Sequence, residues 1–236
     1  MRCTPFAAML FALWLPAARA AEGPVDPSLL VFVGEQVAYA DLNWDPCEEA
    51  NAAAGEDADT ICISMDSYYR ARYRVLDVVH GIAPGEEVEF DLGSHYGDLD
   101  WVSARHALLF VHLHTDEPNW MHKYQGYAVF PTAGGGWATC GRLDWSDGPA
   151  SREIEFAPPL VVDDMSRLTP AGVGYRWDPE VYAVVDGQVR CRVGVPLEEV
   201  VAYVDREILE DVALPPMVPL VRGTPEPVAA PPGDVR

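Results

Sequence analysis

The clearest alternation of apolar and polar side chains lies in residues 68–92, YYRARYRVLDVVHGIAPGEEVEFDL. Successive side chains of an extended strand point to opposite faces. Here one face carries tyrosine, alanine and valine, and the other carries Arg70, Arg72 and Arg74. A turn rich in glycine and proline follows, after which residues 87–92 alternate again. The pattern predicts two long antiparallel strands with one apolar face.

The second of these strands offers partners for the arginines, because Glu87, Glu89 and Asp91 share one of its faces. A short connection places this acidic face beside the arginine face, where opposite charges on neighbouring strands attract each other. We therefore expect a hairpin that neutralises its own charge, with Arg74 and Asp91 within reach of an ion pair. The alternative is an anion site, since guanidinium groups bind carboxylate, sulfate or phosphate in bidentate fashion.

Four further segments have the patterns of strands: residues 29–41, 107–114, 126–132 and 137–140. The first begins as a continuous apolar run and alternates after Gly34, which indicates a long strand with a bend at the glycine. The second is apolar enough to be buried on both faces. Only one short helix is expected between these strands, beginning at Pro46. This order of elements predicts a closed or nearly closed β-barrel or a β-sandwich across residues 29–141.

The last third of the chain has a different pattern. Residues 181–185 and 188–193 flank Asp186-Gly187, a two-residue sequence typical of β-hairpin turns. After Pro196, apolar residues follow the spacing of an amphipathic helix as far as Ala213. We expect a mainly β protein with four parts: a signal peptide (residues 1–20), an OB-like Greek-key β-barrel (21–145), an extension with a β-hairpin and one amphipathic α-helix packed on the barrel (146–213), and a proline-rich disordered tail (214–236).

The first 20 residues have the composition of a secretory signal peptide. Arg2 supplies the positive start, an apolar run follows, and Ala18-Arg19-Ala20 fits the cleavage site. We expect the mature chain to begin at Ala21, to insert into no membrane after cleavage, and to be periplasmic or secreted. The full chain has 16 basic and 37 acidic residues, a net charge of −21. Such a charge argues against nucleic acid as a partner, because the phosphates would be repelled.

Four cysteines follow the expected cleavage site: Cys47, Cys62, Cys140 and Cys191. An even number in an exported chain indicates two disulfides. Three pairings are possible, and we favour Cys47–Cys62 with Cys140–Cys191. A zinc site is the alternative, although no C-x-x-C spacing supports it.

Aromatic side chains gather in or beside the predicted connections, namely Tyr96, Trp101, Trp120, Tyr124, Tyr127 and Trp145. Loops on a rigid barrel often carry binding surfaces, and tryptophan and tyrosine are the usual anchors of such surfaces. The alternative is that these rings cover the barrel ends and pack on the C-terminal segment.

Two other chemistries deserve a hypothesis. His112 and His114 are two residues apart on one strand face, where a pair of imidazoles chelates zinc or copper. Ordinary polar residues at a strand end are the alternative. A hydrolytic site would draw on His95, His106 and nearby acids such as Asp98 and Asp100, but the chain has no G-x-S-x-G or H-E-x-x-H sequence. No motif indicates a cofactor.

The segments LLVFVGEQV, ARYRVLDVVHG, GEEVEF and ALLFV follow one another across residues 29–141. This order resembles the netrin-module and tissue-inhibitor-of-metalloproteinase type of OB-fold. The resemblance implies a five-stranded Greek-key barrel and a binding or inhibitory role outside the cytoplasm. These inhibitors chelate the protease metal with a mature N-terminal cysteine. Here the expected mature terminus is Ala21 and the first retained cysteine is Cys47, so metalloproteinase inhibition is not implied.

Taken together, these patterns favour an exported, non-enzymatic module. Its expected partner is an extracytoplasmic protein, peptide or glycan, bound through aromatic loops at the barrel ends by Trp101, Trp120, Tyr124 and Tyr96. A periplasmic metal-binding protein that uses His112 and His114 is the alternative, and a hydrolase of unknown class is a further one. The chain as a whole looks like an exported bacterial protein.

Overall fold

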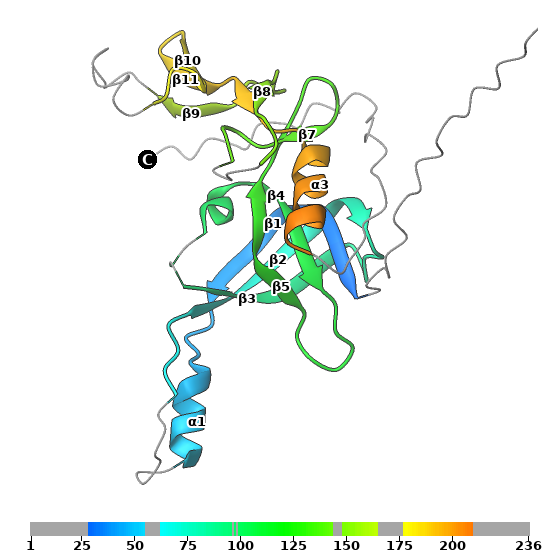
Figure 1. Cartoon of the computed structure of the whole chain (residues 1–236), viewed down its shortest axis with the longest axis vertical. Coiled ribbons are helices and arrows are strands. Elements are labelled where there is room, and N and C mark those ends of the chain that lie inside the picture. The colour runs from blue at the N-terminus through cyan, green and yellow to red at the C-terminus, as the bar shows by residue number, and fades with distance from the viewer. Residues whose placement is uncertain are drawn as a thin grey trace, which may run out of the picture.

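Five strands form a closed barrel in a computed structural model that describes residues 28–54, 62–95, 97, 99–143, 148–164 and 177–209. These strands are β1 (Leu29–Asp41), β2 (Ser67–His80), β3 (Glu87–Ser94), β4 (His106–His112) and β5 (Trp120–Ala128). They are hydrogen-bonded in the order β1-β2-β3-β5-β4 (Figure 1). Neighbouring strands are antiparallel except β3 and β5, which are parallel. The predicted mainly β fold with an OB-like Greek-key barrel is therefore confirmed.

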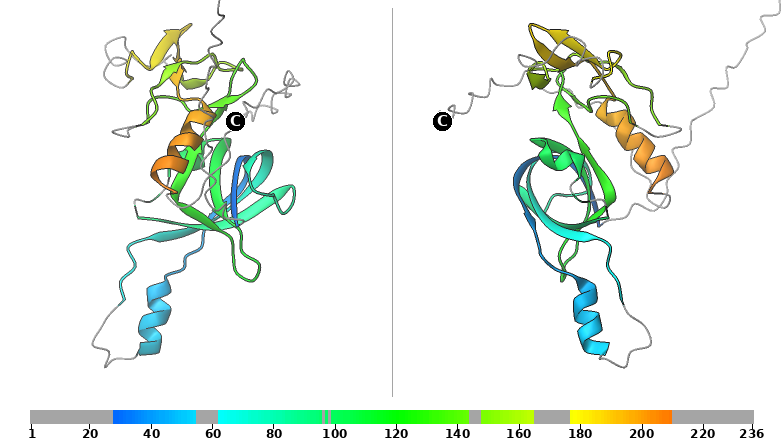
Figure 2. Two further views of the ribbon diagram at one scale, coloured as in Figure 1. Left: turned by 45° about the vertical axis from the view of Figure 1, so that its right-hand side comes forward. Right: turned by 90° about the vertical axis from the view of Figure 1, so that its left-hand side faces the viewer.

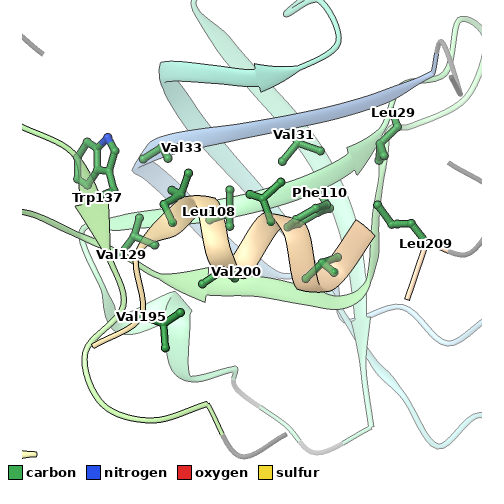
Figure 3. Packing of buried hydrophobic residues seen from close by; sticks show 13 residues of the cluster. Leu29, Val31, Val33, Leu108, Phe110, Val129, Trp137, Val195, Val200 and Leu209 are labelled. Carbon is green, nitrogen blue, oxygen red and sulfur yellow. The ribbon is translucent and has the colours of Figure 1, made fainter. Parts of the chain in front are cut away.

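The continuous apolar runs in β1 and β4 are explained by burial on both faces. Leu30 and Phe32 point into the barrel, whereas Leu29, Val31 and Val33 belong to a second cluster outside it. Helix α3 (Leu197–Glu207) covers this outer cluster with its valines, and Figure 3 shows Val200 in the same cluster as Leu108 and Phe110. A strand between two apolar layers has no solvent face, and its sequence therefore shows no alternation.

Strand β5 corrects the predicted connection around Trp120 and Tyr124, because both residues lie in the barrel wall. The strand has a bulge: Met121 stands opposite Val111 and Gly126 opposite Leu109, so more residues of β5 than of β4 fill the interval. Tyr124 has a φ of 65° within this interval. The bulge interrupts the period of two, which is the signal by which a strand is recognised in a sequence.

The arginine hairpin forms, but in a register that differs from the expected ion pair. Arg74 stands opposite Glu87 and bonds Glu35 of β1 at 2.8 Å, so the predicted Arg74–Asp91 pair is wrong. Asp91 stands opposite Arg70 and accepts two hydrogen bonds from it, at 2.6 and 2.8 Å. Arg72 lies 3.5 Å from Glu87. Each arginine thus has a carboxylate neighbour.

The chain beyond the barrel forms small sheets and the helix α3. Its strands are β6 (Phe130–Pro131), β7 (Trp137–Ala138), β8 (Arg152–Glu153), β9 (Val161–Asp164), β10 (Tyr182–Val185), β11 (Gln188–Cys191) and β12 (Val193–Gly194). The predicted hairpin joins β10 to β11, with positive φ at Asp186 and Gly187. Helix α3 ends at Glu207, earlier than the predicted Ala213, and residues 210–213 lie outside the described part.

Two disulfides, Cys47–Cys62 and Cys140–Cys191, have the favoured pairing, with Cα–Cα distances of 5.1 and 6.1 Å. The first ties helix α1 (Pro46–Ala54) to the returning chain. The second joins β11 to the segment after β7. None of the described helices is long and apolar enough to cross a membrane. The expected signal peptide and the proline-rich tail lie outside the described residues.

Candidate functional site

Three aromatic rings form a row that leads from the segment after β1 onto the outer surface of the barrel. Trp44 packs edge-on against Tyr68 at 5.0 Å between ring centroids, and Tyr68 packs edge-on against Trp120 at 6.3 Å. Trp44 is 40% exposed, and the other two rings are partly buried. Gly93 of β3 leaves room for the row, since a Cβ there would lie 3.3 Å from the Tyr68 ring. We call Trp44, Tyr68 and Trp120 the aromatic row.

One ring of the row, Trp44, belongs to an arm that projects from one end of the barrel and is built from residues 42–54 and 62–66 (Figures 1 and 2). Asp45 caps the first turn of α1 by accepting the backbone N–H of Cys47 at 2.8 Å. Asn51 exchanges two hydrogen bonds of 2.9 Å with the backbone of Cys62. Together with the disulfide, these bonds hold the two sides of the arm to each other.

The arm exposes apolar side chains. Ile63 is 78% exposed and Met65 is 70% exposed, on the same arm as Trp44. Loop 113–119, between β4 and β5, leaves the barrel at the same end as the arm (Figure 2). Large exposed apolar groups that gather at one end of a protein typically mark an interaction surface.

Polar groups border the row on the side of β5. The Lys123 ammonium donates to Asp66 at 2.5 Å, and His95 Nδ1 lies 3.4 Å from the same carboxylate. The hydrogen bond from Lys123 is the main reason that the pKa of Asp66 lies below its usual value. Tyr124 is 37% exposed, and its hydroxyl accepts the backbone N–H of His95 at 3.3 Å. These contacts give the row a polar rim.

The structure brings together only some of the predicted binding residues. Trp120 lies in the row and Tyr124 at its rim, whereas Tyr96 is outside the described residues. Trp101 lies in the short helix η1 (Asp100–Ser103) and is only 3% exposed, so its indole belongs to the barrel core. Sequence reasoning missed Trp44 and Tyr68, although alternation already places Tyr68 on the outer, arginine face of β2.

The histidines make a different pair from the expected one. His112 Nε2 and His122 Nδ1 share a hydrogen bond of 3.0 Å between β4 and β5. His114 is exposed in the following loop, where its backbone N–H donates to the Asn119 side chain. Among the described residues, no group of three or more His, Cys, Asp or Glu side chains is arranged to hold a metal ion. His112 thus contacts His122 rather than His114, and metal binding by His112 and His114 stays a prediction.

The histidine pair predicts a loss of stability in mild acid. Burial, together with the neighbouring His112, lowers the pKa of His122. The unfolded chain then binds more protons than the folded protein near pH 6, so stability rises with pH there and is lost as the pH falls through the folded pKa. We expect the urea concentration at the unfolding midpoint to decrease as the pH is lowered from about 7.5 to about 5. His122→Gln should flatten this slope, whereas the control His114→Gln should keep it. Equal slopes in all three proteins would contradict the assignment.

The hypothetical hydrolytic residues have separate environments. His95 contacts Asp66, while the ring of His106 packs against Trp137 at 5.0 Å. Asp100 begins η1, and Asp98 lies outside the described residues. The structure gives these two histidines different partners rather than a shared acid.

The closed barrel, the aromatic row and the arm define the candidate site. Comparisons of the chain with known protein families, with curated proteins and with solved structures find no match. The function of the protein is therefore inferred from the chemistry and geometry of this site.

Proposed function

We propose that this protein is an exported, non-enzymatic module that binds an extracytoplasmic protein, peptide or glycan through the aromatic row and the arm. The observation that carries the proposal is the chain of edge-to-face contacts from Trp44 through Tyr68 to Trp120 on the outside of the barrel. Tryptophan and tyrosine bury a large area on binding and have few rotatable bonds, so they lose little entropy when a ligand orders them.

The surroundings of the row support a binding role. Trp44, Ile63 and Met65 leave apolar area in water on one arm, where a folded protein gains nothing from it unless a partner covers it. The polar rim of Asp66, Lys123 and Tyr124 suits the border of an interface, because interfaces typically surround apolar anchors with polar groups.

The proposed location outside the cytoplasm rests on two independent features. Disulfides persist in oxidising compartments, and this chain has two. The first 20 residues have the pattern of a secretory signal peptide. The resemblance of residues 29–141 to the netrin-module type of OB-fold also implies a binding role outside the cytoplasm.

A capture experiment tests the proposal. The immobilised protein is incubated with an extracytoplasmic extract of the source organism and with a glycan array, and the retained ligand is then titrated against variants. We expect Trp44→Ala and Tyr68→Ala each to weaken retention by about tenfold or more, the usual effect of removing an aromatic anchor.

The matched control for the capture experiment is Val184→Ala. This residue is 52% exposed, but it lies on β10 in the three-stranded sheet, away from the barrel. Its loss should leave retention unchanged. If Trp44→Ala and Tyr68→Ala retain the ligand as well as the unmodified protein does, the rings only cover the barrel surface and the proposal fails.

A further inference from the structure

Strand β3 has an open edge next to the aromatic row. On one side, β3 pairs with β2 along its whole length, from Arg74–Glu87 to Ser67–Ser94. On the other side, its pairing with described strands is limited to Asp91 opposite Trp120. The segment from Glu87 to Phe90 thus has one paired side and one side without a neighbouring strand in the described part of the chain.

The direction of the backbone groups follows from two hydrogen bonds. The N–H of Asp91 donates to the Asn119 carbonyl at 2.8 Å, and the carbonyl of Glu89 accepts from the Asn119 side chain at 2.8 Å. Alternate residues of a strand direct their N–H and C=O groups to the same side. The N–H of Glu89 and both backbone groups of Glu87 therefore point to the open edge, where they are available to another strand.

A groove of about 320 Å³ lies along this edge. Its lining comes from β3, from the turn before it, from loop 113–119 and from Arg70 of β2, and it includes Pro84, Val88, Phe90 and Pro118. Asn119 of the lining directly precedes Trp120 of the aromatic row in the chain. An extended segment in this groove would pair with β3 on one side and contact the loop on the other.

The charge of the groove selects the kind of segment. Its lining carries the carboxylates of Glu87, Glu89, Asp91 and Glu117, and Arg70 is the one arginine or lysine in the described lining. Arg70 is already held by Asp91 through two hydrogen bonds. The side chains of Glu87 and Glu89 are 39% and 54% exposed. Arg72, which is outside the lining, lies 3.5 Å from Glu87, so the excess negative charge of the groove comes mainly from Glu89 and Glu117. This excess disfavours other acidic strands, including those of a second copy of this chain, whose net charge is −21.

We propose that the open edge of β3 binds an extended, basic peptide segment of a partner protein as an additional strand. This proposal rests on the proposed binding function and narrows its ligand class to a peptide with lysine or arginine at alternate positions. Backbone hydrogen bonds to Glu87 and Glu89 hold the segment, and the carboxylates of the groove contact its basic side chains. The aromatic row receives the part of the partner that continues past Asn119.

The test uses a phage-displayed library of random nonapeptides, selected against the full chain. We expect the selected sequences to be enriched in lysine or arginine at alternate positions. A synthetic selected peptide should bind at least about tenfold more weakly to the double variant Glu87→Lys/Glu117→Lys. Two peptides are compared, one N-methylated at the odd-numbered residues and the other at the even-numbered residues. One of them should lose binding and the other should keep it, because only one edge of the peptide faces β3.

The control for the charge reversal is Glu153→Lys, whose side chain is 85% exposed on β8. It should bind the peptide as the unmodified protein does, and thermal unfolding of all variants checks that they are folded. Selection without enrichment of basic residues, or binding that is unaffected by the charge reversal, would overturn the open-edge proposal.

The two proposals fail in distinguishable ways. If peptides lose affinity for Trp44→Ala but not for Glu87→Lys/Glu117→Lys, the aromatic row binds them and only the open-edge proposal fails. If retention of the natural ligand is unchanged in Trp44→Ala while basic peptides bind in a charge-dependent manner, the open edge stands and the role of the aromatic row fails. A ligand found on the glycan array alone also overturns the open-edge proposal.

Discussion

Replacing Trp101 by alanine is expected to destabilise the protein by about 3–5 kcal/mol, the usual cost of removing a buried tryptophan side chain. Its indole is 3% exposed and packs against Tyr73 at 6.0 Å between ring centroids. It also lies against Gly126, where a Cβ would be 2.6 Å from the indole. No small movement fills the space that such a ring leaves. Urea unfolding followed by circular dichroism measures the loss.

Two matched variants show whether packing is the cause. Trp101→Phe should cost much less, because the indole N–H is buried without a hydrogen-bond partner among the described residues and its removal breaks no such bond. Trp44→Ala, at a ring that is 40% exposed, should lower stability by no more than about 1 kcal/mol. If the Trp101→Ala protein is as stable as the unmodified one but no longer binds its ligand, Trp101 contacts the ligand and the assignment to the core is wrong.

Replacing Arg70 by alanine is expected to destabilise the protein by about 2 kcal/mol, because it leaves the Asp91 carboxylate without its bidentate partner. The Asp91 side chain is only 6% exposed, while that of Arg70 is 42% exposed, so water replaces the lost contacts in part. Arg72→Ala should cost less than about 1 kcal/mol, since both Arg72 and its partner Glu87 are well exposed.

A double-mutant cycle separates the pair from its surroundings. The double variant Arg70→Ala/Asp91→Ala should be more stable than the sum of the two single losses predicts. When both side chains are removed, no charged partner is left unpaired. Urea unfolding of the four proteins at pH 7 gives the coupling energy. If Arg70→Ala is no more destabilising than Arg72→Ala, the bidentate pair contributes no more than an exposed one.

The barrel was predictable because each kind of strand burial leaves its own pattern in the sequence. Strand β2 has one solvent face, and its alternation is plain in the sequence, while LLVFV in β1 and ALLFV in β4 are buried on both sides. The disulfide pairing was also predictable, because Cys47–Cys62 closes one short loop. These patterns depend on residues close together in the chain, so they can be recognised without the tertiary structure.

The site was only partly predictable. A tryptophan in a connection either anchors a ligand or seals a core, and the composition around Trp101 and Trp120 is similar. The outcome depends on distant residues: Trp101 meets Tyr73 and Gly126, whereas Trp120 meets Tyr68. The open edge of β3 was likewise beyond the sequence, because it follows from where β5 begins to pair and not from the residues of β3.

The hairpin of residues 68–92 shows the division most clearly. Alternation along the two segments already predicts that arginines and carboxylates share the outer faces of two neighbouring strands, because the period of a strand sets the face on which each side chain lies. Which arginine pairs with which carboxylate depends on the packing of the strands. The register of β2 and β3 pairs Arg70 with Asp91. Strand β1 supplies Glu35 to Arg74, from which it is 39 residues away in the chain. Faces are set by the geometry of one strand, whereas partners are set by the packing of several.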